Sequence, residues 1–156
     1  MPESLGFDLL HFLYVLSAAL VVGGGFALGG AAAPALFRTL ERADAGTTFG
    51  AMLERWDGVA LVASIALVVT TAWRALAFEA EAPVLRWLAV FVVLVATLYS
   101  SAWANPIARG LRRETREFDD LPATAPERRD FARYHARSRR AMSLAVLAGL
   151  VALYLS

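Results

Sequence analysis

Cysteine and lysine are both absent from this chain of 156 residues. Without cysteine there is no disulfide, no thiolate metal site and no cysteine nucleophile. Without lysine there is neither a Schiff-base lysine nor a P-loop lysine. Charge is also sparse, since charged residues make up 19% of the chain and the formal net charge is +1. That balance gives no reason to expect a nucleic-acid partner.

Apolar residues are abundant instead. They make up 58% of the sequence, and the mean hydropathy of +0.54 is too high for an ordinary soluble domain. A bilayer core about 30 Å thick needs about 20 apolar residues in one helix. Four stretches approach that length: residues 9–30, 58–77, 84–104 and 141–155. The sequence therefore predicts an all-α fold in which residues 1–156 form one membrane domain, a four-helix bundle whose helices extend into the cytoplasm.

The ends of these stretches carry local signals. Glu3 and Asp8 precede the first stretch without any basic residue, so we expect a retained span there and not a signal peptide. Pro34 predicts a kinked continuation of the first helix, and Pro106 an end or bend of the third. The fourth stretch is short, and its helix is expected to begin near Glu127 as an amphipathic lead-in.

Arginine distribution predicts the orientation. The segment between stretches one and two holds three arginines and the segment between stretches three and four holds ten, which is thirteen of the fifteen. Basic loops stay in the cytoplasm, so both termini are expected on the non-cytoplasmic side of a cell (inner) membrane, in a multi-pass protein. The remaining two, Arg74 and Arg86, flank a brief external turn that contains Glu79 and Glu81.

Small residues recur at spacings that favour helix contacts. Gly25 and Gly29 are four residues apart in the first stretch, and similar series occur in the third and fourth. Lipid tails are as apolar as leucine, so close packing at small residues holds membrane helices together. These seams are either contacts within the bundle or a face for a homo-oligomer or another membrane protein.

His11 is the clearest candidate for chemistry, because an ionisable residue within a span is costly to keep. Asp8 lies three residues earlier on the same helical face and is a candidate to orient the imidazole. With both termini outside, Thr71, Trp87 and Tyr154 are expected in the same external layer, forming a small polar ligand pocket with His11. The alternative is that His11 and Asp8 are an interfacial anchor bonded to headgroups and water.

A second polar group is expected at the cytoplasmic face. Its expected members are Arg38, Arg55, Asp57, Asn105, His135 and Ser138. It is interpreted either as a structural layer of ion pairs or as a site for anions or lipid headgroups. His135 lies across the membrane from His11, so the two cannot share one metal ion or one haem.

Several short motifs resemble the transmembrane protein 205-like domain of unknown function, a bacterial family. The residues that carry this resemblance are His11, Gly24–Gly25–Phe26, Ala33–Pro34–Ala35–Leu36–Phe37–Arg38, Ala45–Gly46, Phe49–Gly50, Asn105–Pro106 and the His135/Ser138 pair. Met142 departs from the family pattern, which often has Asn there. The resemblance implies a four-span bundle without an established reaction. A more distant likeness, carried by His11, is to copper resistance D and HemJ-like membrane proteins, which implies copper or haem handling.

Three functions follow as hypotheses. The first is binding or handling of a small ligand, a metal ion or haem near His11, with His11 as the metal ligand. The second is a structural or interaction protein that docks partner proteins or anionic membrane lipid through its glycine seams and arginine-rich face. The third is a transporter, for which four spans would require oligomers. No motif decides whether the chain is an enzyme.

Overall fold

The computed structural model describes residues 2–79 and 83–156. It is 90% helical and has no strand within those residues. In chain order the elements are α1 (Pro2–Phe26), η1 (Ala27–Ala32), α2 (Ala33–Thr39), α3 (Arg42–Ala77), α4 (Val84–Thr97), η2 (Leu98–Ala104), α5 (Asn105–Glu114), η3 (Phe118–Asp120) and α6 (Pro126–Tyr154). The predicted all-α fold is confirmed.

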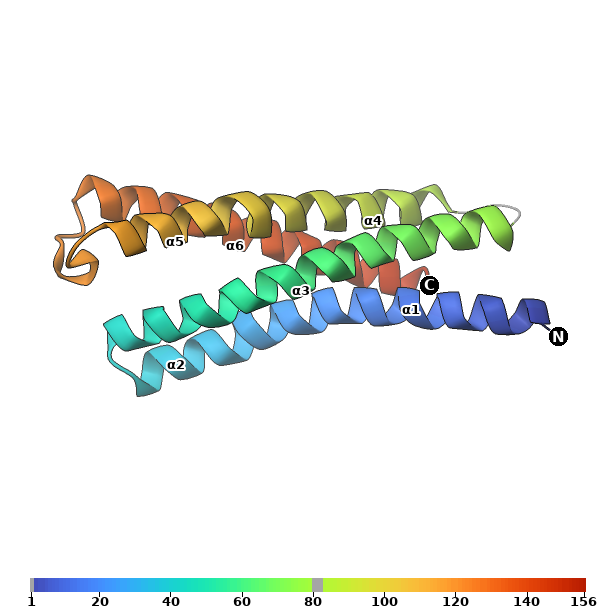
Figure 1. The fold of residues 1–156 in the computed structure, drawn as a ribbon, viewed down its shortest axis with the longest axis horizontal. Helices are drawn as coiled ribbons and strands as arrows, with labels where there is room; N and C mark the ends of the chain where they lie inside the picture. Colours follow the sequence, from blue (N-terminus) through green and yellow to red (C-terminus); the bar gives the residue numbers. More distant parts are fainter. Residues whose placement is uncertain (1, 80–82) are drawn as a thin grey trace.

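The elements form four long rods that lie side by side as a bundle (Figure 1). The first rod is α1, η1 and α2 end to end, the second is α3, the third is α4, η2 and α5, and the fourth is α6. The rods pack in the order α1, α3, α4 and α6, with α6 closing back on α1. Both termini lie toward the end that holds the α3–α4 connection, which we name the termini end; we name the opposite end the arginine-rich end (Figure 1).

Three helical stretches are long and apolar enough to cross a membrane: Leu5–Thr39, Arg42–Ala77 and Val84–Glu114. They belong to the first three rods, which supports the prediction of a membrane protein. The fourth rod differs because arginines fill its first half, and the apolar part begins only at residue 141. Its helix starts at Pro126, one residue before the predicted start.

The first and third rods each contain a π-helical segment just before a proline. η1 ends at Ala32, two residues before Pro34, and η2 ends at Ala104, two residues before Pro106. Proline cannot donate the helical hydrogen bond, and its ring crowds the carbonyl four residues earlier. A wider π turn relieves that crowding without ending the helix. The third rod therefore continues through Pro106 and does not end there.

The core lies where side chains from all four rods meet. Tyr14, Leu67 and Val93 are fully buried there, and small alanines fill the space between them. Tyr14 also donates a hydrogen bond of 2.6 Å to the carbonyl of Ala152, which ties α1 to the last turns of α6. Gly149 lets α6 approach α1, since a Cβ there would lie 2.7 Å from Cγ2 of Val22.

The glycines of the first rod have different environments. A Cβ on Gly24 would overlap the indole ring of Trp56, and a Cβ on Gly25 would overlap Val146. Gly29, in contrast, has open space around its missing side chain. In the predicted seam, Gly25 therefore makes a contact within the bundle, whereas Gly29 lies on the outer surface.

Replacement of Gly25 by leucine should destabilise the bundle by about 1–3 kcal/mol, because the added side chain must push Val146 and α6 away. The matched change Gly29→Leu adds the same side chain to open space and should leave stability unchanged. Thermal unfolding in detergent micelles measures both. Equal losses in the two variants would show that the packing assigned to Gly25 is wrong.

Candidate functional site

Two buried arginines and one half-buried carboxylate form a cluster at the termini end. Arg74, in the last turn of α3, is 4% exposed, and Arg86, in the first turn of α4, is 3% exposed. Glu79 accepts from both of them: Arg74 Nη2 lies 3.0 Å from Oε1, and Arg86 Nη1 lies 3.0 Å from the same oxygen. Arg86 Nη2 pairs with the second oxygen, Oε2. One carboxylate thus joins the two helices.

His11 completes this cluster from α1. Its Nδ1 lies 3.2 Å from Nη1 of Arg74. Because a guanidinium only donates hydrogen bonds, Nδ1 must accept, and the ring proton of the neutral imidazole is then on Nε2. The ring also stacks on Phe7, with centroids 6.0 Å apart and planes 7° from parallel. His11 is therefore held in one tautomer and one orientation.

Aromatic rings cover the guanidinium of Arg74. Its Cζ lies 5.2 Å from the ring centroid of Phe7 and 5.0 Å from that of Tyr14. Arg86 is less fully satisfied, because its Nε is buried with no hydrogen-bond partner within the described residues. Burial pushes the pKa of the Glu79 carboxyl upward, but hydrogen bonds and charge from Arg86 and Arg74 outweigh burial and hold that pKa below its ordinary value. Glu79 is thus kept ionised between two cations.

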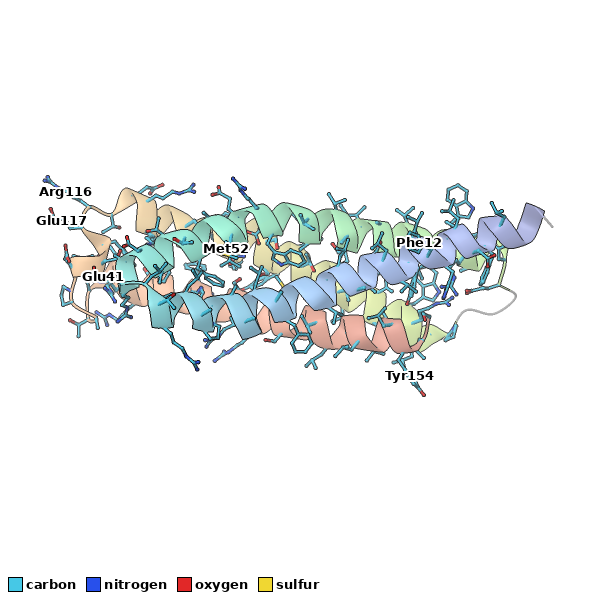
Figure 2. The ribbon with its side chains drawn as sticks, turned by 90° about the horizontal axis from the view of Figure 1, so that it is seen from below. Phe12, Glu41, Met52, Arg116, Glu117 and Tyr154 are labelled. Atoms are coloured by element: carbon cyan, nitrogen blue, oxygen red, sulfur yellow. The ribbon has the colours of Figure 1, made fainter. Side chains whose placement is uncertain are left out.

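The other residues expected near His11 take different positions. Asp8 is exposed, and the hydrogen-bond partner that the structure gives the His11 ring is Arg74. Thr71 is fully buried, and its hydroxyl donates to the carbonyl of Leu67 at 2.7 Å. Trp87 is half-exposed, and Tyr154 is 88% exposed and points away from the bundle (Figure 2). Glu81 lies outside the described residues.

The residues around His11 do not fit a metal ion or a haem iron. The Arg74 guanidinium faces Nδ1, and the tautomer it selects leaves a proton on Nε2, so neither nitrogen offers a free lone pair to a metal. The neighbouring positive charge also repels a cation. In the part of the chain that the structure describes, no group of three His, Cys, Asp or Glu side chains could hold a metal ion.

A second buried polar group lies toward the arginine-rich end. Asp57 of α3, 4% exposed, accepts 2.5 Å from Arg109 and 2.8 Å from the amide of Asn105. The Asn105 oxygen accepts from Ser138 of α6 at 2.5 Å, and Ser138 lies 2.8 Å from the hydroxyl of Ser100. This chain of hydrogen bonds, which we call the Asp57 network, links three rods. Sequence analysis missed Arg109 and Ser100; the spacing of Arg109 four residues after Asn105 was the available signal.

The remaining residues expected in that layer form no hydrogen bond with the Asp57 network within the part of the chain that the structure describes. Arg38 and Arg55 are exposed on α2 and α3. His135 stacks on Phe131, with ring centroids 5.7 Å apart. Burial, and then the charge of Arg139, lower the pKa of His135. His135 is thus a neutral packing residue near neutral pH.

The position of Arg112 explains the glycine of the Ala45–Gly46 motif. The guanidinium of Arg112 lies directly over Gly46, where any Cβ would overlap it. It also donates to the carbonyl of Ala43 at 3.1 Å and pairs with Asp119 at 2.8 Å. Gly46 thus leaves room for the arginine side chain that ties α3 to η3.

Replacement of Asp57 by alanine should destabilise the protein by about 3 kcal/mol, since Arg109 and Asn105 lose the carboxylate that satisfies them. Ser138→Ala should cost about 1 kcal/mol for each of its two hydrogen bonds. Arg113→Ala is the control, because its 2.6 Å pair with Glu54 is exposed and should contribute little. Unfolding in detergent measures all three, and a loss in Arg113→Ala equal to that in Asp57→Ala would contradict this ranking.

The comparisons with known proteins point to an uncharacterised family. No curated protein and no solved structure matches the chain. The resemblances to transmembrane protein 205-like, copper resistance D and HemJ-like proteins therefore stay predictions. One family model matches residues 16–117, a range that includes Asp57, Arg74, Arg86 and Asn105 and leaves out His11. That match covers well over half of the chain, which therefore belongs to the family described as "Domain of unknown function (DUF4149)".

Proposed function

We propose that this membrane protein binds a small anionic ligand, carrying a carboxylate or phosphate group, at the cluster of His11, Arg74 and Arg86. The observation that carries the proposal is a pair of buried guanidiniums that share one carboxylate, with the Nε of Arg86 left without a partner within the described residues. Arginine is the side chain best suited to carboxylate and phosphate, because its donors match both oxygens.

Glu79 occupies the position that a ligand anion would take. Its two oxygens accept from Arg74 and Arg86, so a bound carboxylate or phosphate would compete with it or share the guanidiniums. The Nε2 proton of His11 adds a further donor beside Arg74. Aromatic cover from Phe7 and Tyr14 keeps this region poor in water, which strengthens charge-assisted hydrogen bonds.

The distribution of arginines supports the proposed topology. We place the arginine-rich end in the cytoplasm and both termini outside a cell (inner) membrane, with α6 as the fourth span. Arg74 and Arg86 are the two arginines that lie at the opposite end, and both are buried against Glu79. The other thirteen arginines lie in the two segments at the arginine-rich end, and this excess of basic residues favours a cytoplasmic position for that end.

The anion-binding proposal is tested with acetate and inorganic phosphate at constant ionic strength, titrated against the protein in detergent micelles. Binding is read from the unfolding temperature and from titration calorimetry. We expect saturable stabilisation of the native chain. Glu79→Gln should bind the ions about tenfold more tightly, because it removes a competing negative charge, and Arg86→Gln should abolish binding.

Arg42→Gln, at an exposed arginine at the other end, is the matched charge control and should bind as the native chain does. Circular dichroism establishes that each variant keeps its helices. A Glu79→Gln variant that is folded and binds neither ion better than the native chain would overturn the proposal. A haem absorption band, or bound copper that disappears in His11→Ala, would overturn it in favour of a metal or haem site.

The topology is tested by single cysteines, for which the chain is a natural background because it contains none. Ser156→Cys should react with a membrane-impermeant maleimide in intact cells, and Thr124→Cys, between η3 and α6, should react only after lysis. The reverse pattern would place the arginine-rich end outside.

A further inference from the structure

An apolar groove runs along the outer side of the bundle between the third and fourth rods. Its volume is about 310 Å³. The lining comes from α4, η2 and α6 and consists of Phe91, Val92, Val95, Ala96, Tyr99, Ala141 and Leu144. The groove lies on the part of the bundle that the long apolar helices place in the membrane. Its natural neighbour there is a lipid acyl chain.

Toward the arginine-rich end, the groove continues into a row of aromatic rings. Tyr99, which lines the groove, lies 5.0 Å from the ring of Trp103, and Trp103 lies 5.8 Å from the ring of Tyr134 on α6. Trp103 is 45% exposed, so this row reaches the surface. Tyrosine and tryptophan favour the depth of lipid headgroups, because their rings are apolar and their polar tips need water.

Arg137 lies on α6 between the groove residue Ala141 and the aromatic ring of Tyr134. Its guanidinium carbon lies 5.9 Å from the ring centroid of Tyr134. Residues 137, 141 and 144 are spaced by four and three, so Arg137 shares one face of α6 with the groove residues Ala141 and Leu144. Within the described ranges neither Arg137 nor the exposed Arg140 forms an ion pair. Both positive charges are therefore open to an outside anion.

We infer that this surface is a binding site for one anionic phospholipid, separate from the site of the proposed function. An acyl chain occupies the groove, the phosphate pairs with Arg137 and Arg140 at the end of the groove, and Trp103 and Tyr134 flank the headgroup. Along α6 the groove residues Leu144 and Ala141 are followed by Arg140 and Arg137 and then by Tyr134, so the unpaired cations lie within about one turn of the end of the groove, beside the aromatic rings. The charge of the site selects an anionic headgroup over a zwitterionic one.

Quenching of Trp103 fluorescence tests this site. The protein is reconstituted in phosphatidylcholine vesicles that contain the same fraction of acyl-brominated phosphatidylglycerol or acyl-brominated phosphatidylcholine. The Trp103 signal is the part of the emission that Trp103→Phe removes. We expect stronger quenching by the brominated anionic lipid, and Arg137→Gln should lower that preference about fivefold.

The matched control is Arg42→Gln, which removes the same charge from an exposed position at the start of α3 and should keep the preference. Circular dichroism and gel filtration establish that each variant is folded. Equal quenching by the two brominated lipids would show an ordinary lipid contact and overturn the inference. Equal loss of preference in Arg137→Gln and Arg42→Gln would also overturn it, since general charge attraction would then explain the selectivity.

Discussion

The pairing of buried charges inside an apolar bundle is the constraint on which this structure depends. A carboxylate away from water is tolerated only when cations and hydrogen-bond donors surround it. Asp57 meets Arg109 and Asn105 in this way, and Glu79 meets Arg74 and Arg86. Each carboxylate joins helices that are separate in the sequence. These two ion-pair layers, the Asp57 network and the Glu79 cluster, therefore fix the register of the rods at both ends of the apolar core.

Between these layers the rods are held by close approach at small residues. Gly24 packs against the ring of Trp56, Gly25 packs against Val146, and Gly149 packs against Val22. Alanines such as Ala18 and Ala145 are fully buried in the same region. Where lipid is as apolar as the core, contact area and dispersion decide which faces meet. Larger residues at these positions would separate the rods and weaken the ion-pair layers as well.

Both proposed sites use arginine donors that the pairing of charges within the bundle does not fully satisfy. At the termini end, two guanidiniums share one carboxylate, and Arg86 Nε has no partner within the described residues. At the arginine-rich end, two half-buried arginines are engaged: Arg109 with Asp57, and Arg112 with Asp119 and the carbonyl of Ala43. Arg137 lies over the ring of Tyr134 and forms no ion pair with any residue that the structure describes. Cations that the fold does not neutralise are the ones available to a ligand or a lipid.

The sequence by itself determined the helices, because their signals are local: run length, proline position and arginine clusters predicted four rods and the start of α6 within one residue. It also singled out Asp57, Asn105 and Ser138, since polar residues beside apolar spans are conspicuous. Only the tertiary structure decided which partners these residues meet and which helix faces turn inward. In α1, Tyr14 and Ala18 are buried, whereas Leu13 and Leu16 are exposed. A membrane helix is apolar on both its core face and its lipid face, so hydropathy cannot separate the two, and the pairing of His11 with Arg74 emerges only when the rods pack.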